Sequence, residues 1–315
     1  MATGIVSVAL DLDNETTLSL ALLAVALAIL CLLAGEVVRD LARQRRRICR
    51  EARSPESFTV VAATAVIATR LTLAGWHLSG ELLLAVAFTA WLALLAPVAR
   101  HWTTPTTGAS FLPIVATEAL AVIAATLAER RHAEVLAVAS LGLFLIGLAL
   151  YPLVAIRFDR RELLVGLGDH WIAGGALAIS TLAAANLAVA AHTLGIGRYE
   201  EDAFRHGAVG LWLASMLWLP VLLTAEVVQP RLQHDRRRWA TVFPVGMYCT
   251  CSVVVGRLID SNAITEVARA SIWIALAVWL ATAIAESRTL LRFSGSSVAC
   301  RRRGGRGCAG RRSSD

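Results

Sequence analysis

Long apolar segments separated by short charged clusters dominate the hydrophobic pattern of this chain. Nine of them are about as long as the roughly 20 residues that a helix needs to cross a bilayer. Backbone polar groups in lipid must be satisfied internally, and the strict alternation of a transmembrane β-barrel is absent, so we predict an all-α integral membrane protein. The predicted spans lie near residues 18–38, 57–76, 81–99, 110–128, 133–156, 169–191, 207–228, 240–258 and 268–285.

A tenth apolar segment opens the chain and is about half as long as a span requires. It covers residues 1–10 and is interrupted by Asp11 and Asp13. No basic region precedes it and no cleavage site follows it, so we do not expect a signal peptide. We expect about ten transmembrane helices with a truncated first one, and Met1 as a clipped or misassigned start.

The basic residues are distributed unevenly between alternate loops. All 30 are arginine. They concentrate in loops that follow every second span, such as residues 39–53 and 231–238, whereas acidic residues gather in the opposite loops, such as 200–202. Positive charge near span ends is retained in the cytoplasm. We therefore predict a multi-pass protein of the plasma membrane with both termini in the cytoplasm.

Composition narrows the function classes. Hydrophobic residues make up 57% of the 315 residues and charged residues 17%, and the mean hydropathy is +0.64. Topology explains the net charge of +7, so we expect the lipid bilayer and no nucleic acid as a partner. The chain contains no GxxxxGK[ST], GxSxG or HExxH motif, and Cys249 and Cys251 cannot share one helix face. We predict no enzyme activity, no cofactor and no metal site.

The chain divides into two regions. Residues 1–292 form one transmembrane domain, which leaves no room for a second folded domain of useful size. Residues 293–315 have no apolar periodicity and combine six arginines with Gly and Ser. We expect a disordered basic tail on the cytoplasmic side, against anionic lipid headgroups.

Two charged residues lie inside predicted spans. Glu118 stands near the middle of the 110–128 span among apolar and small residues. It would line a water-filled pathway, pair with a cation or be protonated, and a neutral or hydrogen-bonded packing role is the alternative. Arg70 lies about two turns from the outer end of the 57–76 span. It would snorkel towards the headgroups or attract anions to the mouth of a pathway.

Two prolines lie inside predicted spans. Pro113 and Pro244 each remove a backbone donor and are candidates for helix kinks that open space between helices, although simple packing geometry is an equal alternative. Phe243 directly precedes Pro244. A ring held at such a bend can gate a pore by excluding water, although most such rings only pack or face lipid.

Four runs together resemble the tellurite-resistance/dicarboxylate transporter family, which includes the plant slow anion channels. They are MATGIVSVAL, FLPIVATEALAV, GDHWIAGGALAISTLAAA and WATVFPVGMY, in the family's order and spacing. The resemblance implies ten helices arranged as five hairpins around a central pore, with odd-numbered helices inside and kinked by proline, and commonly a homotrimer. It also implies that Phe243 occludes the pore.

The resemblance indicates transport of anions, either small inorganic anions or C4-dicarboxylates, through an aromatic-gated pore. Glu118 departs from the family pattern, where we expect an uncharged amide, and suggests proton-coupled export of a dicarboxylate or sulfite as an alternative. A non-transporting membrane component is a further alternative, and an enzyme acting on lipid or a redox carrier is disfavoured because no cluster of His, Asp or Cys is evident. The sequence does not choose among sulfite, chloride, nitrate and malate.

Overall fold

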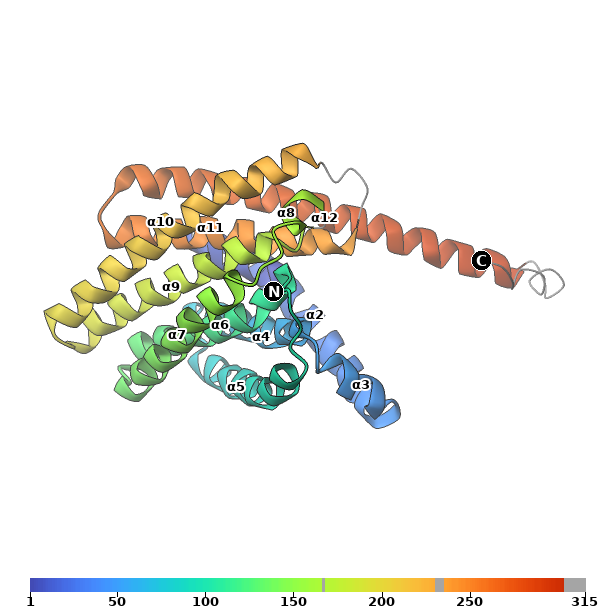
Figure 1. Cartoon of the computed structure of the whole chain (residues 1–315), viewed down its shortest axis with the longest axis horizontal. Helices are drawn as coiled ribbons and strands as arrows, with labels where there is room; N and C mark the ends of the chain where they lie inside the picture. Colours follow the sequence, from blue (N-terminus) through green and yellow to red (C-terminus); the bar gives the residue numbers. More distant parts are fainter. Residues whose placement is uncertain (166–167, 230–234, 303–315) are drawn as a thin grey trace.

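The computed structural model describes residues 1–165, 168–229 and 235–302 (Figure 1). This part of the chain is helical and contains no β-strand, only an isolated bridge between Thr106 and Phe158. Short 3-10 turns cover Pro55–Ser57, Gly108–Phe111 and Arg236–Arg238. The helices are α1 (Ala2–Leu12), α2 (Thr16–Arg43), α3 (Arg45–Glu51), α4 (Phe58–Leu73), α5 (His77–Arg100), α6 (Leu112–Arg131), α7 (Glu134–Ala155), α8 (Glu162–Val165), α9 (Trp171–Leu194), α10 (Arg198–Val228), α11 (Trp239–Leu258) and α12 (Asn262–Arg302).

Nine helices within the described residues are long and apolar enough to cross a membrane, namely α2, α4, α5, α6, α7, α9, α10, α11 and α12. The apolar helix α1 has only 11 residues. The prediction of an all-helical membrane protein with nine full spans and a short first helix is therefore confirmed.

Within the described residues, α1 and the nine spans pair as five hairpins: α1 with α2, α4 with α5, α6 with α7, α9 with α10, and α11 with α12. The first helix of each hairpin also contacts the first helix of the next, in the order α1, α4, α6, α9, α11 and back to α1. These five inner helices enclose a common axis, as the resemblance implies.

Burial separates the inner helices from the outer ones. In the most apolar stretch of each span, 67% to 100% of the residues are buried in the four long inner helices, against 17% to 28% in the five outer helices. The outer helices expose large apolar side chains such as Leu92, Val138 and Leu217. Lipid can cover such a surface without cost, which is why outer spans need no polar face.

Glycine lets the inner helices approach one another closely. A Cβ at Gly175 of α9 would lie 2.9 Å from Cγ of Pro244 in α11, and a Cβ at Gly246 of α11 would lie 2.8 Å from Cγ2 of Ile5 in α1. Small residues at helix crossings bring backbones together in membrane proteins. The ring of inner helices therefore depends on these two glycines.

Several helices extend beyond the predicted apolar spans. α10 begins at Arg198 and α12 at Asn262, because arginine and other good helix formers can continue a helix past the hydrocarbon core. The helix α12 is described as far as Arg302, past residue 293, where the predicted tail begins. Residues 303–315 lie outside the described part, and the disordered tail stays a prediction.

Candidate functional site

A small cavity lies on the axis of the bundle and is lined by all five inner helices. Its volume is about 10 Å³, which is room for no more than about one water molecule. The lining is apolar apart from a single threonine. The lining residues are Ile5, Val8, Val66, Thr69, Ala119, Val122, Ile179, Leu182 and Met247. The axis is therefore closed at this level by packed side chains.

Phe243 precedes the cavity-lining Met247 by about one helical turn of α11 and is not itself among the lining residues. Its side chain is 1% exposed and stands four residues before Met247, so both project from the same face of the helix. The next residue, Pro244, packs against Gly175 of α9 and fixes α11 at this point. Helical periodicity therefore puts Phe243 on about the same face of α11 as Met247, one turn nearer the start of the helix.

The two proline candidates occupy different positions in their helices. Pro113 is in the first turn of α6, directly after the 3-10 turn Gly108–Phe111, where a proline removes no intrahelical hydrogen bond. Pro244 is in the interior of α11, where a proline does remove one.

Glu118 is fully buried where α6, α7 and α9 meet. Ser180 Oγ of α9 donates a hydrogen bond to Glu118 Oε1 at 3.0 Å. A Cβ at Gly147 of α7 would lie 2.5 Å from the same oxygen, so this glycine makes room for the carboxyl group. Glu118 Oε2 has no hydrogen-bond partner among the described residues. Glu118 therefore sits beside the axis, next to the cavity-lining Ala119, and not among the lining residues.

Arg70 is also buried, with 1% of its side chain exposed. Its Nη2 lies 2.7 Å from Asp11 Oδ1, and its Nε donates to Ser19 Oγ at 2.8 Å. Ser7 and Ser19 exchange hydrogen bonds through each other's carbonyl oxygens, at 2.7 Å and 2.6 Å. The guanidinium thus joins α4 to the hairpin of α1 and α2 inside the bundle, and does not reach its surface.

Two further arginines hold the turn between α1 and α2, which sequence reasoning missed. Arg269 of α12 pairs with Asp13 at 2.6 Å, and Arg257 of α11 donates to the carbonyl oxygen of Leu12. A signal was available, since acidic residues at the end of the first segment and arginines at the end of the 240–258 span fall on the same predicted side of the membrane. The short helix α1 is fixed in the ring by these polar contacts as well as by packing.

All five inner helices begin at the same end of the bundle, because each hairpin returns the chain to the side from which it started. Helix N-termini carry partial positive charge. The loops at this end also hold most of the loop arginines, including Arg100, Arg157 and Arg237. This end, here called the arginine-rich end, is therefore electropositive around the axis.

A carboxylate occupies the N-terminus of the α6 span, which was also not foreseen. Glu162 Oε2 of α8 accepts a hydrogen bond from the backbone N–H of Gly108 at 2.7 Å. Burial raises the pKa of Glu162, although the bond from Gly108 opposes the shift. No group of three or more His, Cys, Asp or Glu residues is placed to hold a metal ion within the described ranges.

Comparison with known proteins identifies the family. An uncharacterized membrane protein of Mycobacterium tuberculosis, in strains CDC 1551 and H37Rv, is 30% identical over 122 residues. The match covers 37% of this chain and spans about 61% of the length of those curated relatives. Residues 1–286, nearly the whole helical bundle, match the family described as voltage-dependent anion channel (SLAC1). The resemblance seen in the sequence is thereby confirmed, and the chain belongs to the SLAC1 family of voltage-dependent anion channels.

Proposed function

We propose that this protein conducts anions along the axis enclosed by α1, α4, α6, α9 and α11, and that Phe243 closes the pathway. Membership of the family implies anion transport, and its members are channels and transporters rather than enzymes. The observation that carries the proposal is the axial cavity, which all five inner helices line and which is too small for an ion. An apolar constriction of this kind can gate a pore by excluding water.

The electrostatics of the bundle support an anionic substrate. Converging helix N-termini and the arginine-rich end would raise the local concentration of anions at one mouth of the axis. At the other end, Arg70 supplies a buried positive charge that Asp11 partly offsets, and we propose that it attracts anions there. Pro244 would keep α11 bent at the gate, and Pro113 would set the start of α6.

The gate is tested by anion flux into liposomes that contain the purified protein. Phe243→Ala should raise the flux about tenfold, which corresponds to a barrier lowered by about 1.4 kcal/mol. Phe88→Ala is the matched control, because Phe88 lies on the outer helix α5 and is 39% exposed. Equal flux through the two variants would exclude Phe243 as the gate. No flux above empty vesicles at any pH would exclude transport itself.

Proton-linked transport is a second candidate, and the position of Glu118 favours it. An ionised carboxylate with a single hydroxyl donor is costly to bury, so proton exchange is the chemistry that this position supports. Glu118→Gln should abolish any flux driven by a pH gradient and leave passive flux intact. Glu134→Gln, at the exposed start of α7, is the control. Loss of pH-driven flux in both variants, or in neither, would exclude Glu118 as the coupling residue.

We further propose an anionic substrate, a homotrimeric assembly and a location in the plasma membrane. Small inorganic anions and C4-dicarboxylates both suit an electropositive mouth, and a flux series with chloride, nitrate, sulfite and malate distinguishes them. The family resemblance supports a homotrimer in the plasma membrane, which chemical cross-linking in native membranes tests. A correctly inserted protein that moves none of these anions would instead be a non-transporting membrane component.

A further inference from the structure

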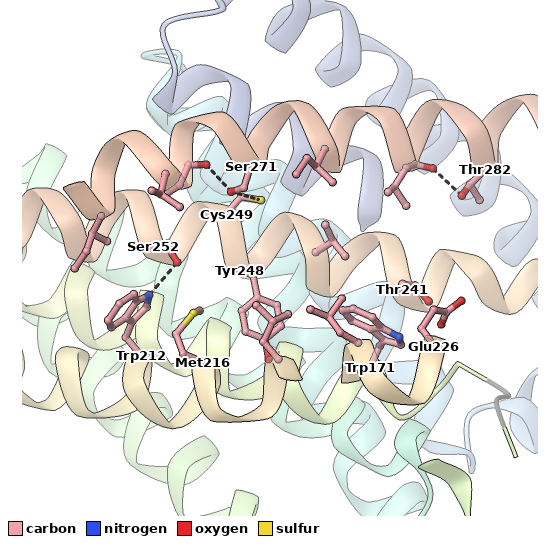
Figure 2. A pocket seen from close by; sticks show the side chains of 18 of the residues that line it. Trp171, Trp212, Met216, Glu226, Thr241, Tyr248, Cys249, Ser252, Ser271 and Thr282 are labelled. Atoms are coloured by element: carbon pink, nitrogen blue, oxygen red, sulfur yellow. Dashed lines mark hydrogen bonds between the residues drawn. The ribbon is translucent and has the colours of Figure 1, made fainter. Parts of the chain in front are cut away.

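A large groove lies outside the ring of inner helices, between α10 and α12, with α11 as its floor (Figure 2). Its volume is about 790 Å³, within the range of roughly 300–1,000 Å³ of sites that hold small organic molecules. Aliphatic side chains such as Leu219, Val245 and Val278 line most of its length. Because the three helices are membrane spans, the apolar walls of the groove lie at the depth of lipid acyl chains.

The polar groups along the body of the groove have partners within the protein. Trp212 Nε1 donates to Ser252 Oγ at 2.9 Å, and Ser271 Oγ donates to the carbonyl oxygen of Ala268 at 2.6 Å. Thr282, which lies towards the end of the groove marked by Thr241 in Figure 2, donates from Oγ1 to the carbonyl oxygen of Val278 at 2.8 Å. These groups already have hydrogen-bond partners within the protein and need none from a bound molecule. The middle of the groove therefore suits a hydrocarbon chain.

One end of the groove is different. Figure 2 shows Trp171, Thr241 and Glu226 gathered there, away from Trp212 and Ser252. Trp171 is 3% exposed, and its Nε1 has no hydrogen-bond partner among the described residues. The same holds for Nε of Arg238, which also lines the groove. Buried donors without an acceptor are costly, so this end is built to receive an acceptor atom from an occupant.

The donor-bearing end coincides with the arginine-rich end of the bundle. Trp171 begins α9, Arg238 immediately precedes α11, and both therefore lie at the level where these spans enter the membrane. Tryptophan and arginine are characteristic of the headgroup layer, and the arginines of this end complement an anionic phosphate. An occupant with a phosphate at this level and an acyl chain along the groove is a membrane phospholipid.

We propose that this groove binds one phospholipid, whose phosphate accepts hydrogen bonds from Trp171 Nε1 and Arg238 Nε while an acyl chain lies between α10 and α12. The carboxyl group of Glu226 lines the same end of the groove.

Native mass spectrometry of the full chain, released from nanodiscs of phosphatidylethanolamine and phosphatidylglycerol, tests the proposal. Trp171→Phe removes the indole N–H and keeps an aromatic ring, and Arg238→Gln removes the guanidinium. Each should lower the retained phospholipid about threefold, and the double variant at least about tenfold, in line with the loss of charge-assisted hydrogen bonds. Trp212→Phe, the same change at the other end of the groove, should retain as much lipid as the wild type.

Three results would overturn the proposal. One is equal lipid retention by the wild type and both single variants, which tests the site even where the double variant does not fold. Another is displacement of the lipid by a neutral alkyl detergent with equal ease in the wild type and the variants. The third is a cross-link between residues of the groove and a second copy of the chain, which would make this face a subunit interface. None of these measurements depends on anion conduction.

Discussion

Arg70 and Glu118 are both fully buried, but their charges are compensated in different ways. Arg70 has a carboxylate partner in Asp11 and a hydroxyl acceptor in Ser19. Among the described residues, Glu118 has the hydroxyl of Ser180 as its one hydrogen-bond partner. A buried charge is costly to separate from its partner, whereas a buried carboxyl group with one hydroxyl donor is costly to ionise.

Replacing Asp11 by Asn should destabilise the protein. Removal of one partner from a buried ion pair typically costs roughly 3–5 kcal/mol. Because Asp11 is 26% exposed, water compensates in part, and we expect a loss of about 2 kcal/mol in thermal unfolding in detergent. Glu36→Gln, which breaks the exposed pair with Arg39, should change stability by less than about 1 kcal/mol. Equal melting temperatures for the two variants would contradict the role given to Asp11.

Glu162 should make stability depend on pH. Burial raises its pKa in the folded protein above the ordinary value of 4.5. Such a group stabilises the fold most when protonated, so its contribution is present below about pH 4.5 and is lost as the pH rises through the raised value. Glu162→Gln is neutral and still offers an oxygen to Gly108. It should melt at the wild-type temperature near pH 4 and above it near pH 7.

The control for Glu162 is Glu134→Gln, at an exposed position. Its difference in melting temperature from the wild type should stay the same across this pH range. If the difference in melting temperature between Glu162→Gln and the wild type does not grow with pH, burial of the Glu162 carboxyl group does not make stability depend on pH.

The charged residues of the spans could be found from the sequence, but their partners could not. Arg70 and Glu118 stand out because a charge interrupts an apolar run. Asp11 and Glu162 lie at the edge of a span or in a loop, where no periodicity marks them. Each pairs with a residue more than fifty positions away, and only the fold brings such residues together.

At the scale of the helices, close crossings of α1, α9 and α11 set the shape of the ring. Gly175→Ala would place a methyl group 2.9 Å from Pro244 Cγ and force α9 and α11 apart next to Phe243. Overpacking of this kind typically costs about 1–3 kcal/mol. We expect a lower melting temperature and, because α11 carries the proposed gate, a higher basal anion flux.

Gly142→Ala on the outer helix α7 is the matched control, since among the described residues no atom beyond its own stretch of helix backbone lies within 4 Å of its added Cβ. Alanine favours a helix over glycine by about 1 kcal/mol, so this variant should be as stable as the wild type or more so, with unchanged flux. A destabilised Gly142→Ala beside an unaffected Gly175→Ala would show that the crossing of α9 and α11 tolerates a side chain.

Hydropathy located the spans but not their full extents. Apolar runs mark where lipid contacts a helix, and they end where charge begins, so the charged first turns of α10 and the surface helices α3 and α8 went unseen. The inner helices differ from the outer ones in small residues and burial rather than in hydropathy. Periodicity therefore could not separate them, and the family resemblance did.

At the scale of the molecule, the N-terminal helix α1 closes the ring of inner helices by packing against α11, which lies near the other end of the chain. It contacts α4 on one side and α11 on the other, and Arg257 and Arg269 fix its far end through Leu12 and Asp13. Closure of this kind joins residues nearly the whole chain apart. The local sequence pattern cannot predict this contact between the two ends of the chain, although opposite charges on the same predicted side of the membrane are consistent with it.

We predict the orientation of the bundle in the membrane from the arginine distribution, and gene fusions test it directly. Loops at the arginine-rich end should be cytoplasmic, because moving their positive charge across the membrane is unfavourable. A green fluorescent protein fused after Arg53 or at the C-terminus should fluoresce, and alkaline phosphatase fused at either site should be inactive. Fusions after Gly197, between α9 and α10, should behave in the opposite way. Active phosphatase at the C-terminus would invert the topology and place the electropositive mouth, and with it the proposed phosphate site, on the outer face.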